Sequence, residues 1–97
     1  MLRLHISDRA RDDLDGIWRH SLEQWAQARA DEYYLAIRDK LKLIVAQPEI
    51  GVAVDVRPNC RKILSGSHYV YYRTVPGGLE ILRILHQSMD VRRHLTP

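Results

Sequence analysis

The chain has 97 residues and a net charge of +3, with 15 Lys and Arg residues against 12 Asp and Glu. This length fits one domain, 1–97, in which folding buries roughly two-thirds of the unfolded chain's surface. The single cysteine, Cys60, excludes an intramolecular disulfide, and no apolar run approaches the roughly 18 residues of a membrane span. Because the N-terminal stretch MLRLHISDRA also lacks the apolar segment of a signal peptide, we expect a soluble, cytoplasmic domain without membrane contact.

The charge is unevenly distributed. Acidic residues concentrate in the first half of the chain, up to Glu49. The second half is basic, and its cations are Arg57, Arg61, Lys62, Arg73, Arg83, Arg92 and Arg93. An anionic partner, either nucleic acid or an acidic protein, would therefore meet the second half.

The first half predicts one strand and two helices. Residues 2–6 alternate apolar and polar side chains, as a strand does, and Ser7 then suits the N-cap of a helix. The first helical stripe contains Ala10, Leu14, Ile17, Trp18, Leu22 and Trp25. A second stripe runs from Ala30 to Val45 and ends before Pro48. Because the connection at 26–28 is very short, the two helices should form an antiparallel hairpin that needs a sheet to cover its apolar face.

The second half predicts strands. After a loop-like stretch at 53–59, strand patterns cover 61–64, 68–75 and 79–86, separated by Gly-containing turns. The order is β-α-α-β-β-β with a C-terminal tail from Gln87. We therefore predict an α+β fold in which a helical hairpin packs on a small antiparallel β-sheet.

Strand alternation predicts which side chains share a sheet face. If Val75 opposes Leu79, one face carries Tyr69, Tyr71, Arg73, Ile81, Arg83 and Leu85. Arg61 could join the two arginines from the neighbouring strand, but its register is left open by the pattern.

Two interpretations of the sheet arginines follow. A metal-independent RNase needs cations around the phosphate, which Arg61, Arg73 and Arg83 could supply, and proton transfer, which His86 or His68 could supply. Alternatively, the arginines pair with carboxylates or with the C-terminus of a neighbouring segment, and His86 caps the sheet edge. We favour the second interpretation, because polar groups on a sheet face usually have structural partners.

A metal site is a further alternative, formed by His86, Asp90 and His94. It would require a tail that is helical throughout, and the guanidinium groups of Arg92 and Arg93 would oppose a cation. We expect neither a metal nor a cofactor.

Aromatic and acidic residues of the helices suggest structural roles. Trp18, Trp25, Tyr33 and Tyr34 have helical core spacing, so we predict packing between the helices rather than a stacking platform for bases. The acidic group of Asp12, Asp13 and Asp15 suits a solvated helix face.

Several motifs together resemble a known family. They are Leu14-x-x-Ile17-Trp18, Trp25, Ala30-x-x-Tyr33, Pro48-x-x-Gly51, Arg61, Gly66-Ser67-His68, Tyr72-Arg73 and Leu85-His86-Gln87-x-Met89-Asp90 with His94-Leu95. This set resembles the ParE toxins of the RelE/ParE superfamily, which belong to bacterial type II toxin-antitoxin systems. The resemblance spans nearly the whole chain.

The resemblance implies a toxin that poisons DNA gyrase by binding, without being an enzyme, and that a ParD-like antitoxin neutralises. The alternative is a RelE-like ribosome-dependent mRNA endonuclease, in whose active site Arg73 and Arg83 would be matched. The lysines expected before the sheet are missing here, and no Tyr follows Asp90. These departures weaken the nuclease interpretation.

Site residues are expected in two regions. An acidic, amphipathic antitoxin segment would contact Tyr69, Tyr71, Arg73 and Arg83. The target would contact Arg92, Arg93 and His94 on a lightly docked tail, where the apolar residues are sparse. We expect Asp90 to be structural and to accept hydrogen bonds from Arg83, His86 or nearby backbone N–H groups.

Overall fold

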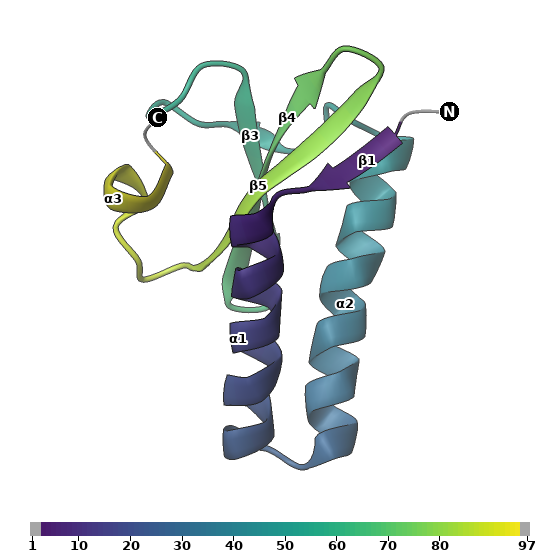
Figure 1. Cartoon of the computed structure of the whole chain (residues 1–97), viewed down its shortest axis with the longest axis vertical. Coiled ribbons are helices and arrows are strands. Elements are labelled where there is room, and N and C mark those ends of the chain that lie inside the picture. The colour runs from purple at the N-terminus through teal and green to yellow at the C-terminus, as the bar shows by residue number, and fades with distance from the viewer. Residues whose placement is uncertain (1–2, 96–97) are drawn as a thin grey trace.

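The computed structural model describes residues 3–95 and places two long helices against a five-stranded sheet (Figure 1). The elements in chain order are β1 Arg3–Ile6, α1 Asp8–Gln24, α2 Gln27–Ala46, β2 Val52–Ala53, β3 Cys60–Ser65, β4 His68–Val75, β5 Gly78–His86 and α3 Val91–Leu95. The predicted α+β fold is confirmed. Within residues 3–95, none of the helices combines the length and apolar character needed to cross a membrane.

The first helix begins where the sequence indicated. The Ala10 amide donates to Ser7 Oγ at 3.1 Å, so Ser7 is the N-cap, and Asp8 lies in the first turn. Ser7 Oγ also donates to the Leu82 carbonyl at 2.9 Å. The same side chain therefore starts α1 and fastens its N-terminus to β5.

The two helices form the expected hairpin, with only Trp25 and Ala26 between them. In Figure 1 they run side by side, and their far ends project beyond the sheet. The predicted stripe is not buried along its whole length. Trp25 and Tyr34 are each 36% exposed. Across the hairpin, however, Trp18 Nε1 donates to Asp31 Oδ1 at 3.2 Å, and the Trp25 and Tyr33 ring centroids are 5.7 Å apart, which agrees with the predicted packing between the helices.

The sheet has the strand order β1-β5-β4-β3-β2. Its four later strands are antiparallel, as predicted, but β1 pairs with β5 in parallel, which makes the sheet mixed. The short strand β2, in a stretch partly expected to be a loop, pairs with Arg61 and Lys62 of β3.

A β-bulge divides the β4–β5 pairing. Val75 pairs with Gly78 and Tyr72 with Ile81, but Tyr71 pairs with Arg83, so Leu82 is the additional residue. The pairing of Tyr71 with Arg83 is as expected, whereas Ile81 packs in the helix-facing core. The assumed pairing of Val75 with Leu79 was one residue out of register, and the bulge restores the register beyond it.

Each sheet face has its own hydrophobic cluster. The helices cover the larger cluster, whose buried sheet residues are Val70, Tyr72, Leu79, Ile81 and Ile84. The opposite face buries Cys60, Tyr71, Leu82, Leu85 and Leu95 beneath the 54–56 loop and α3. Since Leu95 is only 1% exposed, the tail is docked more firmly than expected. One buried side chain at the end of a short helix is enough to anchor it.

Candidate functional site

A cationic pocket of about 360 Å³ opens on the face of the sheet that carries α3. It brings together three predicted site residues, Arg73, Arg83 and His94. Its other lining residues are Ser7, Asp8, Arg9, Arg57, Glu80 and Leu82. Arg9 and Arg57 were not predicted as site residues, because neither lies on the strand pattern that marked the sheet face.

Arg83 is the most constrained cation of this pocket. Its Nε and Nη2 donate to the two carboxylate oxygens of Asp13 at 2.9 and 3.0 Å, and its Nη1 donates to the His94 carbonyl at 3.4 Å. The side chains of Arg83 and Asp13 are only 16% and 15% exposed. The hydrogen bonds that Arg83 donates to the Asp13 carboxylate raise the pKa of Arg83.

The sequence suggested that Asp13 belongs to a solvated acidic face, and this prediction was wrong for Asp13. Its Oδ2 also accepts the Ile84 amide at 2.9 Å. Asp12 and Asp15, its neighbours, are exposed. The difference arises because position 13 faces β5, which the helical spacing alone does not indicate.

Arg73 is more open than Arg83. Its Nε donates to Glu80 Oε1 at 2.8 Å, and its side chain is 38% exposed. The Glu80 carboxylate also lies 3.9 Å from His5 Nε2. Arg57 donates from Nη1 to the Leu95 carbonyl at 3.3 Å, so this arginine caps the C-terminus of α3.

Arg61 does not join Arg73 and Arg83. In the β3–β4 register Arg61 pairs with Tyr72, a residue of the helix-facing core, while Arg73 pairs with Cys60 on the opposite face. Arg61 Nη1 instead donates to the carbonyl oxygens of Gly51 at 2.7 Å and Glu49 at 3.3 Å. The three arginines of the nuclease hypothesis are thus divided between two faces.

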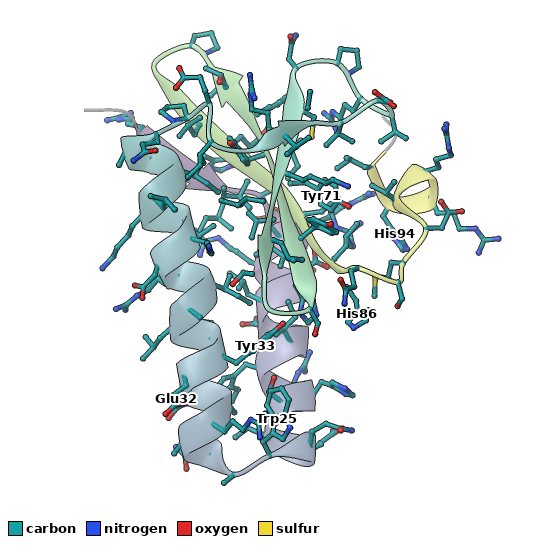
Figure 2. All side chains as sticks on the ribbon, turned by 180° about the vertical axis from the view of Figure 1, so that it is seen from behind. Trp25, Glu32, Tyr33, Tyr71, His86 and His94 are labelled. Carbon is teal, nitrogen blue, oxygen red and sulfur yellow. The ribbon has the colours of Figure 1, made fainter. Side chains whose placement is uncertain are left out.

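The predicted tyrosines lie beside the cationic pocket rather than in it. Tyr71 is 5% exposed and belongs to the core beneath α3, whereas Tyr69 is half-buried. Lys62 Nζ lies 4.3 Å from the centroid of the Tyr69 ring. Figure 2 shows Tyr71 and His94 on the side of the sheet that α3 covers.

Asp90 organises the tail locally. Its Oδ1 accepts the Arg92 amide at 3.1 Å, its backbone carbonyl accepts the Arg93 amide at 3.2 Å, and its Oδ2 lies 4.0 Å from Arg93 Nε. The expected structural role through nearby backbone N–H groups agrees with this geometry. Arg83 and His86 have other partners: Arg83 donates to Asp13 and to the His94 carbonyl, and His86 Nδ1 is bonded to Ser88.

The tail residues expected to meet the target differ in exposure. Arg92 and Arg93 are exposed on α3, whereas His94 is half-buried beside Arg83. Within residues 3–95, no group of three or more His, Cys, Asp or Glu side chains is placed to hold a metal ion.

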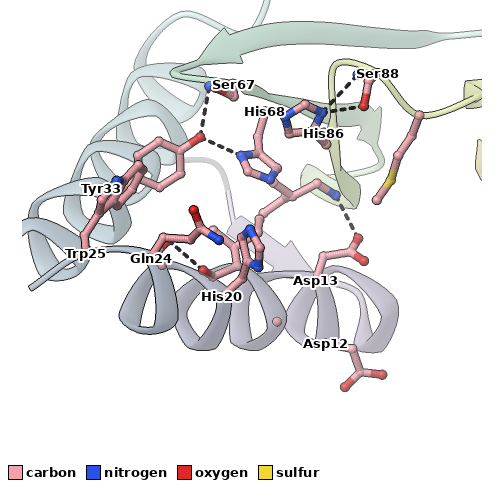
Figure 3. A pocket seen from close by; sticks show the side chains of 15 residues that line it. Asp12, Asp13, His20, Gln24, Trp25, Tyr33, Ser67, His68, His86 and Ser88 are labelled. Carbon is pink, nitrogen blue, oxygen red and sulfur yellow. Dashed lines mark hydrogen bonds between the residues drawn. The ribbon is translucent and has the colours of Figure 1, made fainter. Parts of the chain in front are cut away.

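A second cavity, which we call the aromatic pocket, has a volume of about 600 Å³ and lies between α1 and the His68–His86 end of the β4–β5 pair (Figure 3). One wall consists of Trp25, Tyr33, His68 and His86, with Met89 at the edge. Burial and the nearby rings of His86 and His20 lower the pKa of His68 to about 4. The sequence interpretation treated Tyr33 as helix packing and His68 and His86 as alternative proton-transfer groups beside the sheet arginines, so it missed this pocket.

The chain is similar to known proteins over nearly its whole length. A family model described as the ParE toxin of a type II toxin-antitoxin system, parDE, matches residues 4–91. The chain belongs to the ParE toxin family.

Two curated relatives match this ParE-family chain over nearly its whole length. Toxin ParE1 of Caulobacter vibrioides is 40% identical over 91 residues, which cover 93% of this chain and 94% of the relative. Toxin ParE1 of Mycobacterium tuberculosis is 37% identical over 95 residues, which cover 96% of this chain and 97% of the relative. The predicted family is confirmed.

A solved structure supports the same fold. It is described as the chromosomal ParDE TA system from P. aeruginosa, and its matching chain has a TM-score of 0.79 at 23% identity, with 89% of this chain and 96% of that chain covered. The family model ends at residue 91, where α3 begins. Arg92 and Arg93 of α3 therefore lie outside the residues that the family model matches.

Proposed function

We propose that this ParE-family toxin stops growth by binding DNA gyrase, without catalysing a reaction, and that a ParD-like antitoxin neutralises it. The observation that carries the proposal is the division of the candidate nuclease cations. In the strand register Arg61 lies opposite Tyr72, whose side chain faces the helices. Arg83 forms an ion pair with Asp13, and Arg73 forms an ion pair with Glu80. A phosphate could not be surrounded by these three groups at once, which disfavours the endonuclease alternative.

The target is placed on the exposed side of α3. Arg92 and Arg93 present guanidinium groups there, while Leu95 anchors the helix from below. Exposed arginines on a docked helix suit an acidic protein surface, because they form charge-assisted hydrogen bonds and the helix already fixes their backbone.

The antitoxin is placed on the cationic pocket. An acidic, amphipathic segment would offer a carboxylate to Arg73, which keeps more than a third of its side chain exposed, and lay an apolar side chain near Tyr69. His94 lines this pocket and also belongs to α3. An antitoxin bound there would therefore compete directly with the target for the tail.

The target assignment is tested with gyrase, plasmid DNA and antitoxin-free protein. Supercoiling should be lost and cleavage products trapped with the wild type, and an Arg92→Ala/Arg93→Ala double variant should be at least tenfold less potent. The matched control is Arg38→Ala/Lys42→Ala, which removes two exposed cations from α2. Normal supercoiling with excess wild type would refute the gyrase assignment, and discrete cuts in translated transcripts would establish the endonuclease instead.

The antitoxin placement needs variants that keep the fold. Arg83 is unsuitable because its ion pair with Asp13 is structural, and Arg57 because it caps α3, so Arg73→Ala is combined with Arg9→Ala, an exposed arginine that lines the same pocket. Antitoxin affinity should fall at least tenfold at low salt, and the loss should shrink as salt rises. Affinity equal to that of the Arg38→Ala control would contradict this placement.

A further inference from the structure

The aromatic pocket has no role in the proposed binding of gyrase or antitoxin. Its wall is a series of four rings contributed by the helical hairpin and by β4 and β5. The ring centroids of Trp25 and Tyr33 are 5.7 Å apart, those of Tyr33 and His68 are 5.6 Å apart, and those of His68 and His86 are 5.3 Å apart. The last two contacts are edge-to-face, which is a favoured arrangement of aromatic rings.

Hydrogen bonds hold this wall in place. Tyr33 Oη accepts the Ser67 amide at 2.9 Å and lies 2.5 Å from His68 Nδ1. The Ser88 amide donates to His86 Nδ1 at 3.1 Å, and Ser88 Oγ is 2.7 Å from the same nitrogen. Since His86 Nδ1 accepts the amide, its proton resides on Nε2 in the neutral ring. The wall is therefore organised before any ligand arrives, which lowers the entropic cost of binding.

Gly16 leaves the opposite side of the pocket open. It lies in the middle of α1, where glycine costs about 0.5–1 kcal/mol relative to alanine. A Cβ built at Gly16 would meet no atom within 4 Å, so no contact inside the protein requires glycine there. Beside it, Ile17 and Ile84 form an apolar floor. An occupant that packs directly against the helix would account for the missing side chain.

The charges around the pocket favour an uncharged occupant. The Asp13 carboxylate is neutralised by Arg83, which leaves the exposed Asp12 at the rim to repel an anion. His68 is neutral at physiological pH, because burial and the neighbouring His86 and His20 lower its pKa to about 4. The pocket thus has no strong charge with which to bind an ion, but it offers ring edges and faces.

We propose that the aromatic pocket binds an uncharged aromatic ring of about the size of indole, which packs against α1 at Gly16. Two lining residues, Trp25 and Met89, are large apolar side chains with substantial exposure, at 36% and 50%, and can contact such a ring. The chemistry is the same whether the ring belongs to a free small molecule or to a side chain of a protein segment. The cavity is larger than one ring, so it also has room for the group that carries the ring.

The test is a titration of ¹⁵N-labelled full-length protein followed by amide chemical shifts. Indole represents a free aromatic molecule, and N-acetyl-tryptophanamide represents a side chain within a polypeptide. At least one should produce saturable shifts at residues 16–20 and 84–88, with a Kd on the order of 1 mM or tighter, as expected for so small a ligand. The compound that binds more tightly identifies the source. Saturation by neither compound would overturn the proposal.

Gly16→Leu provides the decisive variant, because the new side chain enters open space and should fill the pocket without disturbing the fold. Binding should weaken at least tenfold, while the melting temperature stays equal or rises. Asp15→Leu, which adds the same side chain at an exposed neighbouring position, should bind like the wild type. Unchanged binding in Gly16→Leu would overturn the placement.

A charged analogue tests the preference for a neutral ring. Indole-3-acetate, an anion, should bind at least tenfold more weakly than indole, because the exposed Asp12 carboxylate at the rim repels it. If it binds as tightly as indole, the proposal of an uncharged ligand is refuted. None of these measurements involves gyrase or antitoxin, so their outcome does not depend on the proposed toxin target.

Discussion

Asp13 and Arg83, 70 residues apart in the sequence, form a two-point ion pair that joins α1 to β5. The same guanidinium group donates to the His94 carbonyl in α3. One arginine therefore connects the helical hairpin, the sheet and the tail. The main role of Arg83 is therefore structural, although its side chain also lines the cationic pocket.

Asp13→Asn should lower the free energy of unfolding by about 2–4 kcal/mol, because it leaves the mostly buried Arg83 without its counter-charge. Denaturant unfolding gives the value. Asp15→Asn is the matched control on an exposed position of the same helix and should change stability by less than about 0.5 kcal/mol. Equal stabilities of the two variants would show that the ion pair contributes little.

Leu95→Ala should lower the free energy of unfolding by about 2 kcal/mol or more, since Leu95 is 1% exposed in the core beneath α3. Amide hydrogen exchange at residues 91–95 should accelerate in the same variant. Removal of the whole tail from Val91 would also uncover Leu82 and Leu85. A truncated chain should therefore melt at a lower temperature than the full chain. An unchanged melting temperature would indicate that the tail is only lightly docked, as the sequence predicted.

Asp90→Ala should have a smaller effect, about 0.5–1 kcal/mol, because Asp90 caps a five-residue helix from an exposed position. The sequence interpretation implied a larger loss through unpaired Arg83 or His86, but both have other partners. Asp90→Asn, which retains an oxygen for the cap, should preserve most of the stability. A loss near 3 kcal/mol in Asp90→Ala would indicate a contact beyond the cap.

His68 should make the protein less stable in mild acid. Its pKa is lowered from 6.5 to about 4 in the folded protein, so between these values the unfolded chain binds a proton that the folded protein does not. The contribution of His68 to stability is complete above pH 6.5 and is lost as pH falls towards 4. An NMR titration of the His68 ring should give a midpoint near 4, and His68→Gln should flatten the pH dependence of unfolding in this window. A midpoint near 6.5 would contradict the prediction.

The sequence by itself determined most elements of this protein, but not β2 or α3. Ser7 caps α1 through a local hydrogen bond, and the short connection at Trp25 and Ala26 requires the helices to fold back. Strand alternation and turn glycines located β3, β4 and β5. These features depend on residues close to one another in the chain, which is why periodicity and capping chemistry predict them. The motifs also sufficed to indicate the ParE family, which the comparisons confirmed.

Only the tertiary structure decided which side chains meet. The β3–β4 register placed Arg61 and Arg73 on opposite faces, and the pairing of Val75 with Gly78 at the turn, one residue from the assumed register, placed Ile81 on the helix side. Asp13 forms its hydrogen bonds with Arg83, and Tyr33 with His68, across separations of 70 and 35 residues in the sequence. A strand pattern repeats every two residues, so a single shift in register exchanges the faces without altering the pattern. Contacts between distant residues follow from packing, and no local periodicity encodes them.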